Sequence, residues 1–360
     1  MKGRPGTART CRPPTRRWGR RPRPEARRGP HVGQASPGSY RPALESPRPA
    51  SGAPACQQRP PGGTSAARPL QSRARRGWRE RSTACQADSV KGPAGLYVLD
   101  HHAPGASGLA VILVHGSLDR AASFARVVRR LPDLHVVTYD RRGYAHSRTA
   151  GPVGVLGDHV ADLIALVGAG PAVVVGHSYG GDVALGAALA SPGPVVGVGA
   201  YEPPLSWTEW WPGRARTADD ADPGRFAERF FRRMVGDGAW ERVGEERRAE
   251  RRADGPALVA ELTSLRSGGP PFDVGHLNVP AVFGRGGESV WHHRRAALEL
   301  HAAVPGSELF DIDGAAHGAH LSHPAGFAQF VRAVIRRSGK SGATSADDAG
   351  ERQPVSREGG

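Results

Sequence analysis

Short apolar runs alternate with amphipathic segments between residues 96 and 337. Uninterrupted runs of this length are typical of strands that are buried on both faces of a parallel sheet. Two intervening segments, Val160–Val167 and Phe327–Val334, repeat apolar residues at the helical spacing i, i+3, i+4, i+7. The pattern predicts an α/β fold with a mostly parallel central sheet flanked by helices. The predicted strands are Leu96–Leu99, Ala110–Val114, His135–Tyr139, Ala172–Val175, Val195–Tyr201, Val279–Phe283 and Glu308–Ile312.

One interval, residues 207–275, breaks this alternation because it contains no strand-like run. The interval is rich in Arg and Glu, has helical spacing, and is too long for a connecting loop. We expect a small helical cap here, above the edge at which the strands end. One stripe of this segment is expected to form the core of the cap rather than a wall of the substrate pocket, and it consists of Phe226, Phe230, Phe231 and Met234.

The first 90 residues differ in composition from the rest of the chain. They contain 20 basic and 4 acidic residues and 14 of the 32 prolines, which accounts for the net charge of +15. A segment without apolar periodicity cannot bury enough surface to offset the loss of chain entropy on folding. We therefore expect a disordered Arg/Pro-rich tail over residues 1–90. One folded domain should follow over residues 91–338, with a second disordered tail over residues 339–360.

Three interpretations of the basic tail stay open. It has the charge of a segment that binds nucleic acid or an anionic surface. It also has the Arg-rich, acid-poor character of an organellar transit peptide, although a secretory signal is not expected because no apolar h-region is present. The third interpretation is an extension without function, such as sequence translated from a misassigned start. We favour the third, so nucleic acid is not an expected partner.

Cysteine usage and hydropathy narrow the class of protein. All three cysteines lie in the basic tail, so the folded part has no thiol, no disulfide and no cysteine-based metal site. No run of 18 apolar residues occurs, and no membrane span is expected. A cytoplasmic protein is the default expectation. We also expect a small-molecule substrate, no cofactor and no metal. No feature indicates an oligomeric state.

The sequence Gly176-His177-Ser178-Tyr179-Gly180-Gly181 follows the apolar run Ala172–Val175 and precedes a helical pattern. A serine between glycines at a strand-to-helix corner is held with its hydroxyl exposed at the end of the sheet. The glycines are needed because a Cβ there would collide with the neighbouring strand or with the first helical turn. Ser178 is therefore the expected nucleophile.

A serine nucleophile needs a base within hydrogen-bond reach. His317 follows the predicted strand Glu308–Ile312 and is surrounded by small residues, so it should lie at the same sheet edge as Ser178. We expect His317 to be the base. Its neighbours His320 and His323 are expected to have a surface or helix-capping role.

The base needs a carboxylate that orients it, and two glutamates fit this role. Glu202 directly follows the strand Val195–Tyr201 and precedes two prolines that make the position rigid. Glu288 follows the next strand and lies in a Gly-rich loop. We favour Glu202 and keep Glu288 as the alternative.

The oxyanion of an acyl-transfer intermediate needs backbone N–H donors, usually one after the nucleophile and one from an early strand-end loop. Tyr179 fits the first position. The segment His115-Gly116-Ser117-Leu118, directly after the strand Ala110–Val114, fits the second, with Ser117 as the favoured donor and Leu118 as the alternative. The sequence 140–143, Asp-Arg-Arg-Gly, is expected to shape a turn at the rim of the pocket without a catalytic role.

Taken in chain order, four of these motifs resemble the α/β-hydrolase superfamily over about residues 95–337. They are Val114-His115-Gly116, Tyr139-Asp-Arg-Arg-Gly-Tyr144, the serine turn 176–181, and the Gly-x-x-His that ends at His317. The resemblance implies a cap between the sixth and seventh core strands. It also implies a triad of Ser178, His317 and an acid after strand six or seven.

The position of the acid departs from the common pattern of this superfamily. Most members carry an Asp in a Gly-x-x-Asp motif after strand seven, where this chain has Gly287, with Glu288 one residue later. Some relatives use the strand-six site, and this supports Glu202. Serine rather than aspartate at position 178 argues against dehalogenase and epoxide hydrolase chemistry. The chain looks most like an actinobacterial-type serine hydrolase with an unassigned substrate.

The favoured function is hydrolysis of a carboxylic ester, thioester or lactone of small to medium size through an acyl-enzyme on Ser178. Carbon–carbon bond hydrolysis, acyl transfer and cofactor-free perhydrolysis are alternatives on the same fold. A ligand-binding protein without catalysis, or one associated with nucleic acid through the basic tail, is an alternative of another class. Trp207, Trp210 and Trp211 indicate an aromatic wall that favours an apolar substrate group, or equally a contact between cap and core.

Overall fold

The computed structural model describes residues 88–102, 108–213 and 221–339. Its centre is an eight-stranded sheet with the spatial order β1-β2-β4-β3-β5-β6-β7-β8. From β4 to β8 all neighbouring strands are parallel, whereas β1 pairs with β2 and β2 with β4 in antiparallel register. The strands are β1 (Asp88–Lys91), β2 (Tyr97–His101), β3 (Ala110–Val114), β4 (His135–Tyr139), β5 (Ala172–His177), β6 (Val195–Tyr201), β7 (Ala281–Gly286) and β8 (Glu308–Ile312).

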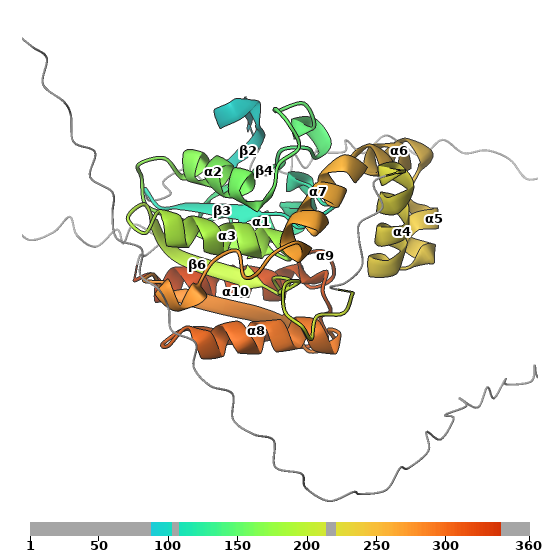
Figure 1. Cartoon of the computed structure of the whole chain (residues 1–360). Coiled ribbons are helices and arrows are strands. Elements are labelled where there is room, and N and C mark those ends of the chain that lie inside the picture. The colour runs from blue at the N-terminus through green and yellow to red at the C-terminus, as the bar shows by residue number, and fades with distance from the viewer. Residues whose placement is uncertain (1–87, 103–107, 214–220, 340–360) are drawn as a thin grey trace, which may run out of the picture. The chain divides into compact units, whose positions relative to one another are not determined.

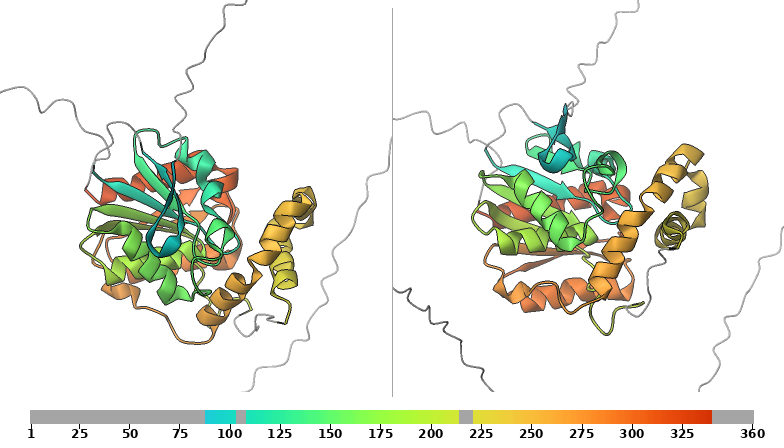
Figure 2. Two further views of the ribbon diagram at one scale, coloured as in Figure 1. Left: turned by 90° about the horizontal axis from the view of Figure 1, so that it is seen from above. Right: turned by 45° about the horizontal axis from the view of Figure 1, so that its top comes forward.

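Helices cover both faces of this sheet (Figures 1 and 2). One face packs against α2 (Leu156–Val167), α3 (Tyr179–Ala190) and α8 (Trp291–Ala303). The other packs against α1 (Ala125–Val128), α9 (Ala319–Ser322) and α10 (Pro324–Arg337). Because both faces are covered, every residue of the central strand β5 is buried, as its apolar sequence predicts.

Among the described residues between β6 and β7, four α-helices lie within the interval in which a helical cap is expected. They are α4 (Pro223–Val235), α5 (Asp237–Arg242), α6 (Glu245–Ala253) and α7 (Gly255–Arg266), and we call them the insert. Apolar residues of α4 and α7 pack on Leu118 and Tyr144 of the strand-end loops. Phe226, Phe230 and Phe231 join this cluster, whereas Met234 of the expected stripe is exposed.

The boundaries differ slightly from those expected. Strand β1 begins at Asp88, so the end of the expected tail 1–90 forms the edge of the sheet. The other tail residues, 1–87 and 340–360, lie outside the described part of the chain. Four short 3-10 helices complete the fold: η1 (Pro93–Gly95), η2 (Ala121–Phe124), η3 (Ala145–Ser147) and η4 (Val274–His276).

The longest described helix, α10, has 14 residues. Crossing the hydrocarbon core of a bilayer takes about 20 apolar residues in a helix. Within residues 88–102, 108–213 and 221–339, no helix has both the length and the apolar character needed to span a membrane.

Candidate active site

Ser178 lies at the corner between β5 and α3, with φ 54° and ψ −130°. Its backbone N–H donates to the carbonyl oxygen of Tyr201 at the end of β6 (2.8 Å). A Cβ at Gly176 would lie 1.9 Å from the carbonyl oxygen of Gly180, and one at Gly180 would lie 2.2 Å from that of Val114. The glycines therefore allow the close approach of strand, turn and helix that holds this serine in a strained conformation.

Glu202 and His317 meet at the same edge of the sheet. His317 Nδ1 lies 2.8 Å from Glu202 Oε2, and the backbone N–H of Gly286 donates to Glu202 Oε1 (2.7 Å). The Glu202 side chain is fully buried, whereas the His317 side chain is 18% exposed. Glu202 also has φ 48°, a left-handed conformation that costs energy for a residue with a Cβ. A carboxylate in this position fixes the orientation of the imidazole ring.

The side chain of the alternative acid, Glu288, has no hydrogen bond to His317 among the described contacts. Glu288 has an exposed side chain, and its backbone N–H donates to the carbonyl oxygen of Ala315 (2.8 Å). The structure thus brings together Glu202 and His317 through a direct side-chain hydrogen bond. The backbone of Glu288 instead contributes a hydrogen bond that holds the loop that carries His317.

The expectation of a surface or capping role for His320 was wrong. His320 is 2% exposed, and its Nε2 lies 3.0 Å from Asp119 Oδ2. The short helix α9 turns it inward against the ring of Phe124, with the ring centroids 5.2 Å apart. His323 is half-buried, and its Nδ1 lies 2.9 Å from the hydroxyl of Ser322.

Two further histidines, His293 and His177, contact His317. The ring of His293 stacks on that of His317, with 4.0 Å between centroids and 20° between planes. His177 Nε2 lies 2.8 Å from the carbonyl oxygen of His317. Burial lowers the pKa of both His177 and His293 well below the ordinary value, and the charge on nearby histidines lowers it further. Both rings are therefore neutral near pH 7.

The loop after β3 lies directly beside the serine turn. A Cβ at Gly116 would be 3.0 Å from the Cβ of Ser178. Leu118, two residues later, has φ 54°. Five described residues other than glycine have positive φ, and three of them, Leu118, Ser178 and Glu202, belong to this region. Strained backbone that gathers at one place is typical of functional sites.

The sequence did not predict the role of Arg141 and Glu261, both of which are fully buried. Arg141 donates to the carbonyl oxygens of His115 (2.9 Å) and Gly116 (3.1 Å), and it forms an ion pair with Glu261 of α7. Glu261 Oε2 also accepts hydrogen bonds from the hydroxyls of Ser117 (2.6 Å) and Tyr144 (2.7 Å). The pair therefore joins the insert to the loop that follows β3.

His115 completes this network as a neutral side chain. The backbone N–H of Arg141 donates to His115 Nε2 (2.9 Å), which leaves Nδ1 to donate to the carbonyl oxygen of Gly116 (2.7 Å). Burial and the charge of Arg141 lower the pKa of His115 to about 3. The ring is thus a fixed hydrogen-bonding group rather than a base.

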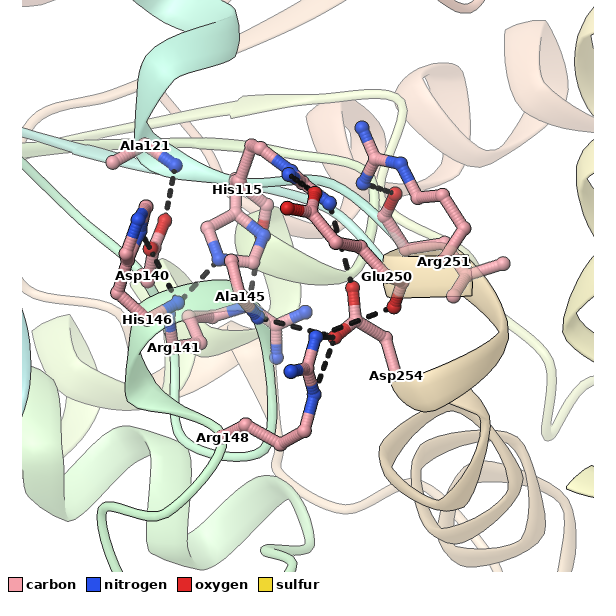
Figure 3. A network of polar contacts seen from close by, with 12 residues as sticks. His115, Ala121, Asp140, Arg141, Ala145, His146, Arg148, Glu250, Arg251 and Asp254 are labelled. Carbon is pink, nitrogen blue, oxygen red and sulfur yellow. Dashed lines mark hydrogen bonds and ion pairs between the residues drawn. The ribbon is translucent and has the colours of Figure 1, made fainter. Parts of the chain in front are cut away.

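Other polar contacts fix the insert against the strand-end loops (Figure 3). Asp254, at the start of α7, accepts from Arg148 (2.7 Å) and from the backbone N–H of Ala145 (3.1 Å). Glu250 pairs with Arg120 (2.6 Å), and Arg251 donates to the carbonyl oxygen of Leu118. The loop after β3 is therefore held from the insert side by several side chains.

Two of the three tryptophans, Trp210 and Trp211, contact residues of α8. Trp211 is buried in the main core, and its ring centroid lies 4.8 Å from that of His292. Trp210 contacts Trp291, and the guanidinium of Arg295 lies 4.3 Å from the centroid of the Trp210 ring. The Trp207 ring contacts that of Phe272. The Trp211 ring also contacts that of His293, with 5.4 Å between centroids. A role of the three tryptophans in substrate binding stays a prediction.

Comparisons with known proteins agree with this fold. Residues 111–330 match the alpha/beta hydrolase family. The chain is 32% identical over 174 residues to lipase LipV of Mycobacterium tuberculosis, and the match covers 46% of this chain and 61% of that relative, which is less than two thirds of its length.

Solved structures with the same fold include two esterases. A thermophilic esterase from Thermogutta terrifontis has a TM-score of 0.56 and 21% identity, with 70% of this chain and 99% of that chain covered. The carboxylesterase CesB from Bacillus subtilis has a TM-score of 0.52 and 19% identity, with coverages of 69% and 91%. The match to the family over most of the folded part shows that this chain belongs to the alpha/beta hydrolase family.

Proposed function

We propose that this protein is a serine hydrolase that cleaves a carboxylic ester, thioester or lactone through an acyl-enzyme on Ser178. The observation that carries the proposal is the buried Glu202 carboxylate, which is hydrogen-bonded to His317 at the sheet edge that also bears the strained Ser178 turn. This combination supports a nucleophile, a base and an orienting acid in one place.

In the acylation step, Ser178 Oγ attacks the carbonyl carbon of the substrate. His317 accepts the hydroxyl proton on Nε2 because its Nδ1–H donates to Glu202, and the Glu202 carboxylate then stabilises the imidazolium. The carbonyl oxygen gains negative charge as the new bond forms. Backbone N–H groups of Tyr179 and Ser117, with Leu118 as the alternative to Ser117, would stabilise this oxyanion.

Collapse of the tetrahedral intermediate breaks the bond to the leaving group, and His317 returns the proton to the departing alkoxide or thiolate. Water then attacks the acyl carbon while His317 accepts one of its protons. Release of the carboxylic acid restores the Ser178 hydroxyl. No cofactor enters these steps.

An apolar group of small to medium size fits the substrate best. The support for this is the aromatic group Trp210, Trp211 and Trp291, in which the Trp211 ring contacts that of His293 in the His293–His317 stack. The lipase and esterase relatives are consistent with an ester substrate.

The direct test is labelling with a fluorophosphonate, followed by assays on p-nitrophenyl esters of increasing acyl length. We expect stoichiometric labelling of the wild type on Ser178 and none in the Ser178→Ala variant, because the reagent reacts only with an activated serine. Turnover of the ester should fall by about 10⁴- to 10⁶-fold in that variant. Retention of turnover in a folded Ser178→Ala protein contradicts the proposal.

A further inference from the structure

A second carboxylate–histidine cluster lies beside the Glu202–His317 pair, in contact with Phe124 and Phe327 of the core. It consists of Asp119 from the loop after β3, His177 at the end of β5, and His320 in α9. One donor atom from each side chain lies within 4.8 Å of the others. None of the three has a chemical step in the proposed acyl transfer, so their convergence in a buried place needs another explanation.

The spacing of the donor atoms fits a tetrahedral metal ion. Asp119 Oδ2 lies 3.0 Å from His320 Nε2, and the rings of His177 and His320 are 4.3 Å apart between centroids. Bonds of about 2.0–2.2 Å from zinc to imidazole nitrogen and carboxylate oxygen place neighbouring ligand atoms about 3.3–3.6 Å apart. An ion would draw the three donor atoms to this spacing from separations of at most 4.8 Å.

The protonation of His177 is that of a metal ligand. Its Nε2 lies 2.8 Å from the carbonyl oxygen of His317 and must donate a proton to it, so Nδ1 carries the lone pair. A ring that donates one N–H to a backbone carbonyl and offers the other nitrogen is the usual arrangement of metal-binding histidine. His177 is 6% exposed, and Nδ1 has no hydrogen-bond partner among the residues that the structure describes.

Glycine at position 116 keeps the space next to this nitrogen open. A Cβ at that position would lie 3.1 Å from His177 Nδ1. Asp119 is held in place by the Ser123 hydroxyl, which donates to Oδ2 (3.0 Å). The carboxylate is therefore oriented toward the two histidines before any ion binds.

We propose that Asp119, His177 and His320 form a binding site for a zinc-class divalent cation, with a fourth coordination position open to solvent or to a substrate group. Asp119 Oδ2, His177 Nδ1 and His320 Nε2 are the ligands. When the ion binds Nε2 of His320, the neutral ring carries its proton on Nδ1, and any second proton is released to solvent.

Occupation of this site should inhibit the hydrolase, and this consequence rests on the proposed function of Ser178. The rings of His177 and His317 are 4.8 Å apart between centroids. His177 directly precedes the nucleophile, and its Nε2 is hydrogen-bonded to the carbonyl oxygen of His317 (2.8 Å). An ion bound to His177 therefore restrains the two segments that carry Ser178 and His317.

Binding is tested without reference to activity. The full chain is freed of metal with a chelator and titrated with ZnCl₂ by isothermal titration calorimetry, and with CoCl₂ by visible absorption. We expect one site, and we expect the His320→Ala and Asp119→Asn variants to bind at least about 100-fold more weakly because each loses a ligand. Circular dichroism of each variant checks folding, and Asp119→Asn keeps the size of the side chain if His320→Ala does not fold.

A cysteine-free background and a control variant exclude other sources of zinc binding. Cys11, Cys56 and Cys85 are thiols that bind zinc, so each titration is repeated with all three changed to serine. His276→Ala, at a histidine whose side chain is 82% exposed, is the matched control and should bind as the wild type does.

A different group of ligands could give the same signal. Glu202, His293 and His317 also place donor atoms within 4.8 Å of one another. Loss of binding in His293→Ala with retention in His320→Ala would assign the ion to that group and overturn the proposal. Absence of a site at micromolar zinc in the cysteine-free background overturns it as well.

The inhibition is measured separately by ester hydrolysis. Zinc should lower turnover of the wild type, chelator should restore it, and the concentration for half inhibition should rise by the same factor as Kd in Asp119→Asn. If zinc binds as expected without changing turnover, the site is confirmed and the inhibitory role is wrong. Failure of the hydrolase assay itself leaves the calorimetric result untouched, so the two proposals fail independently.

Discussion

The core and the insert each contribute one fully buried glutamate, and the two are bonded differently. Glu202 of the core accepts from the backbone of Gly286 and from His317. Glu261 of the insert accepts from Arg141 and from the hydroxyls of Ser117 and Tyr144, with His159 Nε2 also 3.3 Å away. Glu202 faces a ring that can gain a proton, whereas Glu261 faces a guanidinium that is always charged.

This difference indicates that Glu202 acts in the reaction itself, whereas Glu261 positions other groups. A carboxylate without a permanent counter-charge gains interaction energy when its histidine becomes protonated, so its effect appears during the reaction. A carboxylate that is already paired gains nothing at that moment. Glu261 instead fixes geometry, because Arg141 and Ser117 are parts of the network that holds the loop after β3.

Among the substitutions that distinguish the two glutamates, the largest effect is expected from Glu202→Gln. The carboxamide can donate to Nδ1 and so favour the wrong tautomer of His317, and turnover should fall by about 10⁴-fold. Steady-state kinetics on a p-nitrophenyl ester measures this loss. Glu288→Gln is the matched control, because the exposed Glu288 side chain is not bonded to His317, and its turnover should match the wild type. A large loss in Glu288→Gln with little in Glu202→Gln would reverse the assignment.

Much of the fold was predictable because its signals are local. Apolar runs predicted seven of the strands, and glycines that cannot carry a Cβ predicted the turn around Ser178. Strand β1 was missed because its four residues are exposed and Asp88-Ser89-Val90-Lys91 has no apolar run. An edge strand with one neighbour needs little apolar sequence.

The candidate site was predictable only where a motif in the loop after a strand indicated the chemical role of a residue. Glu202 and His317 follow β6 and β8, so their meeting at one sheet edge could be expected. The pair of Arg141 and Glu261 joins residues 120 positions apart, through a helix whose placement no local pattern fixes. One signal was available, because Glu261 lies on the otherwise apolar stripe of α7 that includes Leu258, Leu262 and Leu265.

An intermediate effect is expected from Glu261→Gln. Loss of the ion pair leaves Arg141 uncompensated and releases the loop after β3, and a misplaced oxyanion donor should lower kcat by about 100-fold with KM unchanged. Removing one partner of a buried ion pair also costs about 3–5 kcal/mol of unfolding free energy. Kinetics is therefore measured well below the Tm of the variant, after circular dichroism has confirmed folding.

A readout specific to the oxyanion separates positioning from general damage. An alkyl boronic acid, which forms a tetrahedral adduct with the serine, should bind Glu261→Gln more weakly by the same factor as the fall in kcat. Affinity for the product carboxylate should stay the same. Glu250→Gln is the control for insert contacts, since Glu250 is partly exposed in its pair with Arg120 and should cost less than about 1 kcal/mol. Equal losses of boronate and product affinity contradict the positioning role.

A smaller effect is expected from Ser117→Ala. The change removes one hydroxyl that donates to Glu261 but keeps the backbone N–H that is the proposed oxyanion donor. A single hydrogen bond to a charged group contributes about 1.5–3 kcal/mol, and the remaining donors on Glu261 still fix the loop. We expect kcat to fall by less than about tenfold. A loss as large as that of Glu261→Gln would mean that the hydroxyl itself acts in the reaction.

Substitution of Asp182 should change stability rather than turnover, on which the smallest effect is expected. Asp182 is a buried acid in the first turn of α3, and within the described chain it faces neither a histidine, as Glu202 does, nor a guanidinium in an ion pair, as Glu261 does. Neither carboxylate oxygen has a hydrogen-bond partner among the described residues. Burial, and then the charge of Glu261, raise the pKa of Asp182 well above its ordinary value, so the carboxyl is protonated in the folded state where the unfolded chain is ionised.

The sign of the pH dependence follows from that difference. The folded state binds more protons than the unfolded state from the ordinary pKa of Asp up to the raised one, so unfolding free energy falls as pH rises through this window, by up to about 1.4 kcal/mol per pH unit. Asp182→Asn cannot titrate and should flatten that slope, whereas Asp273→Asn, at an exposed acid, should leave it unchanged. Urea unfolding at a series of pH values measures both. An unchanged slope in Asp182→Asn would mean that this carboxyl is ionised and paired, and that the insert glutamate does not act on it.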